Sequence, residues 1–136
     1  MAIKFHNPKS VSLAGNYSLG AEVPQGARLF YVSGQVGVDS KGKLQAGIDK
    51  QVETVWKNII QVLKSAGMGL GDIVKVNVFL TDSRFIIPYR AIRDRYFPNA
   101  PFPASTLLIV QGLADPGMLV EAGNGALGKK RSRTAR

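Results

Sequence analysis

An amphipathic helix pattern over residues 48–67, followed directly by a strand pattern, constrains the fold most strongly. From Ile48 onward, apolar side chains recur at spacings of three and four, which is the period of one helix face. Gly67 stands where a glycine commonly ends a helix. Residues 73–80, IVKVNVFL, then alternate apolar and polar side chains, which is typical of a strand with one buried face. A helix and a strand in this order favour a sheet covered by helices.

The remaining patterns complete a mixed domain. Residues 29–38, LFYVSGQVGV, are rich in β-branched and aromatic side chains and lead into the turn sequence DSKGKL, which predicts a strand and a hairpin. Residues 105–110 and 118–122 are two further apolar runs, separated by the turn-forming stretch GLADPG. The predicted order is β-β-α-β-α-β-β, an α+β fold in which two helices cover one face of one sheet.

A second, shorter helix is predicted over residues 87–97. Its apolar side consists of Ile92 and Tyr96. Its charged residues fall mostly on the opposite side, which we expect to face solvent; they are Arg90, Arg93, Asp94 and Arg95.

The chain of 136 residues has the size of one domain, and we assign residues 1–127 to it. Residues 128–136, GKKRSRTAR, are predicted to be a solvated, disordered tail. This tail holds five of the positive charges behind the net charge of +9, leaving +4 on residues 1–128. Weak, salt-dependent nucleic-acid binding is therefore expected only through the tail. With no run of about 18 apolar residues and no signal segment, a cytoplasmic protein without a membrane partner is expected.

Several familiar site types are excluded by residue content. The chain has no cysteine and one histidine, His6, so thiol chemistry and histidine-based metal sites are poor candidates, and no metal or cofactor is expected. The glycines of GNGALGKK, residues 123–130, fit phosphate-loop patterns, but Lys130 replaces the Ser or Thr and no helix can follow. The segment GMGLG, residues 67–71, follows a helix and indicates a loop that ends it.

Six segments in the same order resemble one known family. They are GNYSLGAEV at 15–23, LFYVSGQVGVDSKGKL at 29–44, VETVWKNIIQVLKSAG at 52–67, DIVKVNVFLTD at 72–82, RDRYFP at 93–98 and FPAST at 102–106. Together, over about residues 14–127, they resemble the Rid/YjgF family, the reactive intermediate deaminases, also described as endoribonuclease L-PSP-like. The resemblance implies a chorismate-mutase-like α+β fold. It also implies a homotrimer with a central barrel and a small-molecule pocket between adjacent subunits.

Active members of that family hydrolyse reactive enamines and imines to 2-keto acids and ammonia. Because an imine carbon is already electrophilic, such a pocket needs only to hold the substrate, position a water molecule and move protons. By resemblance, Tyr17 and Glu121 are the catalytic candidates. The substrate-binding candidates are Ser33, Gly34 and Gln35 in the S-G-Q turn, with Ser105 and Leu107 on the strand that follows Pro103 and Ala104.

Two positions depart from the family pattern. Where the deaminating members have an arginine that pairs with the substrate carboxylate, this chain has Ser105. A serine hydroxyl cannot replace a bidentate, charge-assisted pair, so the usual activity on 2-imino acids does not follow from the resemblance. Arg90 stands where the family often has asparagine, and it is a candidate to supply the lost charge; the alternative is an exposed helix arginine paired with Asp94.

The sequence thus leaves three functions open. The first is a deaminase-type hydrolase of a small imine. The second is a trimer that binds a metabolite without turnover. The third is ribonuclease action or RNA binding, which the basic tail favours superficially but for which the sequence offers no histidine pair or metal site.

Overall fold

The computed structural model describes residues 2–128, so the basic tail predicted from residue 128 onward lies outside the described residues except for Gly128. Eight strands and helices follow in the order β1 (Lys4–His6), β2 (Gly20–Glu22), β3 (Arg28–Val36), α1 (Ile48–Ser65), β4 (Ile73–Leu80), α2 (Ile86–Tyr96), β5 (Ala104–Ile109) and β6 (Val120–Gly128). Short 3-10 turns at Leu70–Asp72 and Ser83–Phe85 precede β4 and α2.

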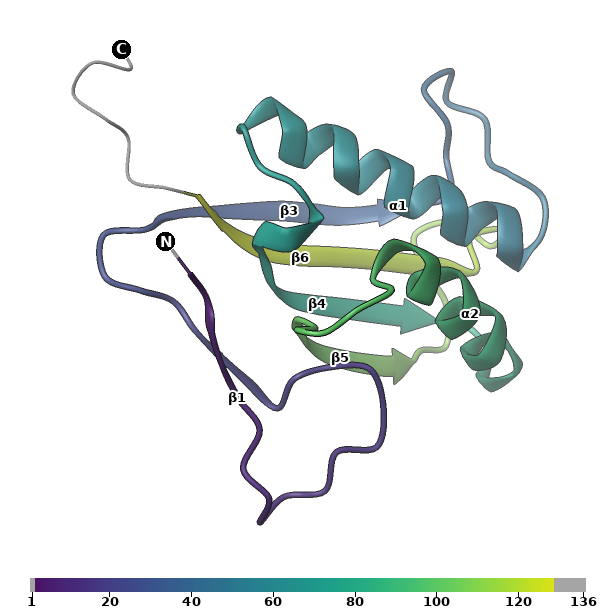
Figure 1. The fold of residues 1–136 in the computed structure, drawn as a ribbon. Helices are drawn as coiled ribbons and strands as arrows, with labels where there is room; N and C mark the ends of the chain where they lie inside the picture. Colours follow the sequence, from purple (N-terminus) through teal and green to yellow (C-terminus); the bar gives the residue numbers. More distant parts are fainter. Residues whose placement is uncertain (1, 129–136) are drawn as a thin grey trace.

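The main sheet has four strands in the order β3-β6-β4-β5. The two outer pairs differ, because β4 and β5 run parallel whereas β6 is antiparallel to both β3 and β4. Helices α1 and α2 lie over the same face of this sheet (Figure 1). The predicted α+β class, with two helices on one face, is confirmed.

Helix α1 forms because its apolar stripe is buried along the sheet. Val52, Val55, Trp56, Ile59 and Leu63 are all 0% exposed. Burying a side chain of this size stabilises the fold by roughly 1.5–3 kcal/mol. The helix ends as the sequence predicts. Gly67 has a positive φ of 71°, and the amides of Gly67 and Met68 donate to the carbonyls of Lys64 and Leu63.

The strand pairing differs from the prediction in the N-terminal part of the chain. The Asp39 carboxylate accepts from the amides of Lys41 and Lys43 and holds the expected turn. The returning strand of the expected hairpin at residues 29–44 is reduced to an isolated bridge between Val38 and Leu44. Instead, β1 and β2 pair with each other as a separate two-stranded sheet.

Strand β6 is longer than predicted, because it continues through the glycine-rich segment that follows Ala122. Gly123 explains this continuation. A Cβ atom there would lie 3.1 Å from the Val32 carbonyl oxygen and 3.2 Å from the Gly34 amide nitrogen. The glycines therefore allow β3 to approach β6 closely, and the described part of the GNGALGKK segment is strand, not a phosphate-binding loop.

The sheet has one covered face and one open face. Val76, Val78 and Leu80 of β4 face the helices and are at most 4% exposed. Lys75, Asn77 and Phe79 alternate with them and line a shallow hollow on the other face. Val74, predicted to belong to the buried set, lines that hollow as well, because the register shifts between Ile73 and Lys75.

Candidate functional site

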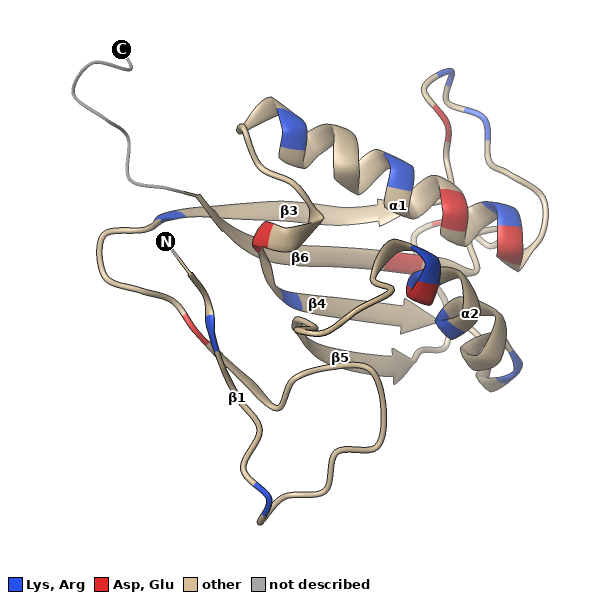
Figure 2. Ribbon diagram, in the orientation of Figure 1, with Lys and Arg blue, Asp and Glu red and all other residues tan. Residues whose placement is uncertain are grey.

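A cleft of about 440 Å³ opens beside the edge strand β5, between helix α2 and the loop that precedes β2. Ser105 pairs in register with Val76, and Leu107 with Val78, so both side chains lie on the helix-covered face. The ribbon of β5 carries no charged residue (Figure 2). On the open face of the sheet, Lys75 of β4 donates to the Thr106 hydroxyl of β5 at 2.6 Å, whereas the charged residues that line the cleft come from α2. The lining includes Tyr17, Arg90, Arg93, Asp94, Ser105 and Leu107.

Ser18 fixes the loop that closes one side of this cleft. Its amide donates to the Pro103 carbonyl at 3.0 Å, and its hydroxyl donates to the Phe102 carbonyl. Ser18 also forms a parallel bridge with Ala104 and is only 4% exposed. The start of β5 therefore holds the neighbouring Tyr17 at the cleft where Ser105 lies.

Arg93 is the unexpected residue of the cleft. Its side chain is 15% exposed, although the sequence pattern placed it on the solvent side of α2. That prediction is wrong because Arg93 follows the buried Tyr89 by four residues and so shares its helix face. The guanidinium lies 6.0 Å from the Tyr89 ring centroid. Its Nε and Nη2 donate to Oδ1 of Asp94 at 3.2 Å and 2.9 Å.

Arg90 lies at the exposed mouth of the same cleft. The alternative prediction, that it pairs with Asp94, is wrong: among residues 2–128 the ion pair of Asp94 is formed with Arg93. The cleft thus contains two guanidinium groups and one carboxylate. These groups give the cleft a net charge of +1, which can attract a bound anion.

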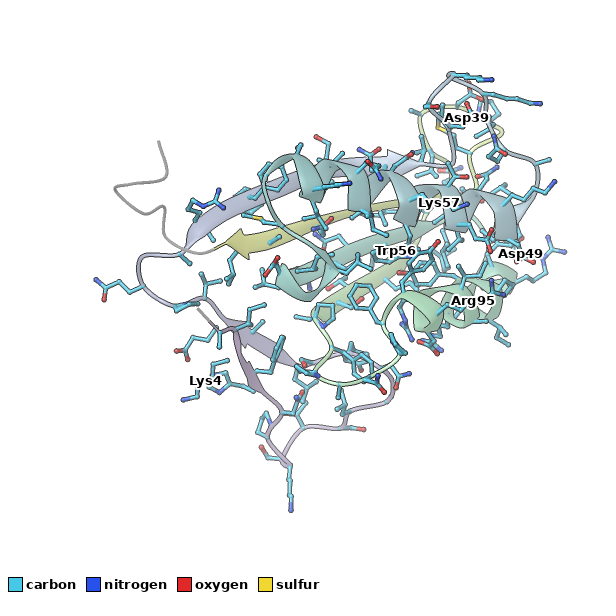
Figure 3. All side chains as sticks on the ribbon, turned by 45° about the horizontal axis from the view of Figure 1, so that its top comes forward. Lys4, Asp39, Asp49, Trp56, Lys57 and Arg95 are labelled. Carbon is cyan, nitrogen blue, oxygen red and sulfur yellow. The ribbon has the colours of Figure 1, made fainter. Side chains whose placement is uncertain are left out.

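A smaller chamber lies behind the cleft, with a volume of about 10 Å³. Asn16, Arg93 and Ser105 line both spaces, so the chamber adjoins the cleft at these residues. Its inner wall is aromatic, because Trp56 packs edge-on against Phe97, with ring centroids 5.3 Å apart. Figure 3 shows Trp56 projecting from α1 into the interior of the molecule. Tyr89 completes this wall.

Two of the three aromatic residues of the wall, Trp56 and Tyr89, have an unpartnered polar atom. Within the described residues, neither the Trp56 Nε1 nor the Tyr89 hydroxyl has a hydrogen-bond partner, and both atoms are buried. Burial also raises the pKa of Tyr89 far above its usual range, the nearby Arg93 charge opposing this only in part. The hydroxyl therefore stays protonated at neutral pH.

Two further predicted residues, Gly34 and Glu121, lie at the open face of the sheet. The S-G-Q turn is a bulge in β3, because the register with β6 shifts between Val32 and Gln35. A methyl group on Gly34 would overlap the Glu121 carboxylate, so this glycine lets the carboxylate lie against the bulge. Gly34 and Glu121 line the open-face hollow, whose volume is about 470 Å³. Within the bulge, the Ser33 carbonyl accepts a hydrogen bond from the Gln35 side chain at 3.2 Å. Gln35 itself pairs in register with Ala122, which pairs with Val78 of the helix-covered face.

The predicted residues therefore form two groups within one chain. Tyr17, Arg90, Ser105 and Leu107 come together in the cleft on the helix-covered face. Glu121, with the bulge around Gly34, lies on the opposite face of the same sheet.

Sequence reasoning missed the inner part of the cleft. The helix pattern places Trp56 in the core, assigns no place to Tyr89 and puts Arg93 on the solvent side. The one signal for Arg93 was its i, i+4 spacing from Tyr89, which places both side chains on one face.

Other chemistry is sparse among the described residues. His6 lies on β1 and contacts the Glu22 carboxylate on β2 at 3.0 Å, at the surface. Residues 2–128 contain no group of three or more histidine or acidic side chains that could hold a metal ion. No helix in this part of the chain combines the length and the apolar character needed to cross a membrane.

The amino-acid sequence is similar to those of several known proteins. The chain is 34% identical over 93 residues to a RutC family protein of Aquifex aeolicus, covering 68% of this chain and 72% of the relative. It is 33% identical over 107 residues to the human 2-iminobutanoate/2-iminopropanoate deaminase, covering 77% of this chain and 75% of that protein.

Solved structures agree with the sequence matches. RidA from the Antarctic bacterium Psychrobacter sp. has a TM-score of 0.70 and 30% identity, covering 90% of this chain and 97% of its own. The Rid-family protein YyfB from Yersinia pestis has a TM-score of 0.84 with 24% identity, covering 93% and 99%, and shows likeness of fold alone. The family model described as endoribonuclease L-PSP matches residues 8–126. The chain therefore belongs to this family, the YjgF/Rid family.

Proposed function

We propose that this protein is a deaminase-type hydrolase that converts a small imine or enamine into a carbonyl compound and ammonia. The observation that carries the proposal is the division of the family's site residues between two faces of one sheet. The cleft and the Glu121 carboxylate lie on opposite faces of one sheet, so they can meet only if two copies of the chain assemble. Relatives named 2-iminobutanoate/2-iminopropanoate deaminase support the reaction class.

The open face of the sheet supports such an assembly. Tyr31 is 77% exposed, Leu29 56% and Leu108 50%. All three alternate along their strands with residues that face the helices, so they gather on the uncovered face. Exposed apolar surface of this kind marks an interface, and we propose a homotrimer in which neighbouring sheets cover it.

In this trimer the cleft beside β5 is completed by a neighbour. Strand β5 is an edge of the sheet, so a neighbouring copy can pack alongside the cleft. Glu121 of the partner subunit, lying against its own Gly34 bulge, then comes close to Tyr17 and Ser105. The site has one component from each chain, and a monomer is expected to be inactive.

The reaction needs few groups. Glu121 accepts a proton from a water molecule as the water oxygen attacks the C=N carbon, and the nitrogen takes up a proton. In the resulting amino alcohol, the hydroxyl proton is transferred to the nitrogen, the C–N bond breaks with loss of ammonia, and the C=O bond of a carbonyl compound forms. Tyr17 offers a hydroxyl at the cleft to hold the substrate nitrogen or the transferred proton. No metal ion is required for any of these proton transfers, because an imine is already electrophilic.

The test is the release of ammonia from an imine generated in situ, for example 2-iminobutanoate formed by an amino-acid oxidase. Glu121→Gln removes the proton acceptor with little change in shape, and we expect a rate loss of about a hundredfold or more. Glu22→Gln makes the same change at an exposed site on β2 and should leave the rate unchanged. Equal rates for the two variants would refute the assigned role of Glu121.

Retained ligand binding without any ammonia release would instead identify a metabolite-binding protein. RNA cleavage by the purified protein that persists in Glu121→Gln would favour the third function. Each of these outcomes contradicts the hydrolase proposal.

A further inference from the structure

Two residues that line the inner chamber carry buried hydrogen-bond donors without an acceptor among the described residues. An indole N–H can only donate, and the Trp56 Nε1 has no partner among the described residues. The Tyr89 hydroxyl is a protonated donor that is equally unpartnered. Leaving a buried donor unpaired costs about 1–3 kcal/mol, so two of them on the wall of one chamber call for an acceptor that enters it.

Arg93 adds a third set of donors at the chamber entrance. Asp94 takes only Nε and Nη2 of the guanidinium, through a single carboxylate oxygen. Within the described residues, Nη1 makes no hydrogen bond. Asp94 therefore fixes the orientation of Arg93 while one edge of the guanidinium stays available to a ligand.

The sizes of the chamber and the cleft, together with their charge, limit which hydrogen-bond acceptor can bind. A chamber of about 10 Å³ has room for roughly one oxygen-sized group, whereas the cleft of about 440 Å³ holds the rest of a small molecule. Two guanidinium groups against one carboxylate leave a single positive charge, which matches a monoanion.

We propose that Arg93, together with Tyr89 and Trp56, forms the carboxylate-binding subsite of this protein, taking the place that Ser105 leaves empty on β5. One oxygen of a small monocarboxylate enters the chamber and accepts from the two aromatic donors, and the other lies on Arg93. The inference rests on the proposed function for the entry of a small substrate into the cleft. Arg93 is then a binding residue, Asp94 its positioning residue, and Arg90 a charge at the mouth.

The chain supplies its own reporter, because Trp56 is its one tryptophan. We expect 2-oxobutanoate to change the Trp56 fluorescence in a saturable manner, and 2-oxobutanamide, which lacks the negative charge, to cause no saturable change. This experiment uses the natural protein and so does not depend on how any variant folds. A fluorescence that responds equally to both compounds, or to neither, would overturn the inference.

Calorimetric titration of variants with 2-oxobutanoate tests which residue binds the carboxylate. Arg93→Gln should weaken binding about tenfold to a hundredfold, and Tyr89→Phe roughly two- to tenfold. Arg95→Gln is the matched control, since it removes the same charge from the same helix, where Arg95 pairs with Glu53 outside the cleft; its affinity should stay within about twofold. Loss of affinity in Arg90→Gln with none in Arg93→Gln would overturn the assignment.

Tyr89→Phe keeps the test decisive if Arg93→Gln fails to fold, because it removes only an unpartnered hydroxyl. If the hydroxyl served packing alone, this variant would bind 2-oxobutanoate as the natural protein does, and the subsite would be refuted. Imine hydrolysis that is unaffected in Arg93→Gln would leave the proposed function standing and refute this inference. Binding of 2-oxobutanoate that depends on Arg93, without any ammonia release, would support this inference and refute the proposed function.

Discussion

Arg93 and Ser105 line both the cleft and the chamber behind it, one from helix α2 and the other from strand β5. A positive charge is therefore present where the sequence alone indicates that one has been lost. The guanidinium comes from the helix layer instead of the strand, and Asp94 fixes its orientation.

The first prediction is that an arginine at position 105 can replace Arg93 in binding the ligand carboxylate. Ser105→Arg in the natural protein should not improve binding of 2-oxobutanoate, because a second guanidinium would be forced beside Arg93. In the background of Arg93→Gln the same change should recover much of the lost affinity, since it restores one cation to the same space. The measurement is a double-mutant cycle by calorimetry, and additive effects of the two substitutions would contradict it.

The second prediction concerns Gly34. A side chain at this position overlaps the Glu121 carboxylate, so Gly34→Ala should displace the carboxylate and lower imine hydrolysis about tenfold or more. Gly71→Ala is the control, since a Cβ atom there meets nothing within 4 Å. If steady-state kinetics gave the same rate for both variants, Glu121 would not need its present position.

The third prediction is a pH dependence of stability. Burial raises the pKa of Tyr89 in the folded protein above its ordinary value of 10.0. A raised pKa means that the stabilising effect is complete below pH 10 and is lost as the pH rises further, because the unfolded chain ionises first. Urea unfolding should therefore show a smaller free energy at about pH 11 than at about pH 8. Tyr89→Phe should reduce that difference, and an unchanged difference would show that Tyr89 does not cause it.

The fourth prediction addresses assembly through the open face. Tyr31→Glu places a charge on the most exposed aromatic side chain of that face and should yield a monomer without imine hydrolysis. Ile87→Glu is the control, because Ile87 is 79% exposed but lies on α2, in the helix layer. Light scattering decides the question: a natural protein that is already monomeric, or an oligomeric Tyr31→Glu variant, would contradict the proposed interface.

Periodicity was enough to predict the main elements. The stripe of α1, its end at Gly67 and the alternation of β4 from Val76 onward all follow from local patterns that the core enforces. The second half of strand β6 was not predicted, because its glycines have no side chains that could show an alternating pattern. These glycines allow the close approach of β3, which is visible only in the folded chain.

The site residues that the resemblance implies stay predictions, and their geometry could not be predicted from the sequence. Resemblance identified Tyr17, Gly34, Ser105 and Glu121, yet assigning them to faces requires the strand register and the bulge in β3. Arg93 was missed for a related reason. A charged side chain counts as solvent-facing in an amphipathic pattern, whereas Arg93 contacts Tyr89 and Asp94 of its own helix and faces the cleft beside β5, a position that the helix pattern alone does not give.

A crystal structure of the natural protein with bound 2-oxobutanoate tests the central claim most directly. We expect a trimer in which the ligand carboxylate lies within about 3 Å of the Arg93 guanidinium, with one oxygen directed toward Tyr89 and Trp56. We also expect Glu121 of the partner subunit to approach the ligand carbon from the other side. A carboxylate bound by Arg90 alone, or a ligand that no partner carboxylate approaches, would contradict the account.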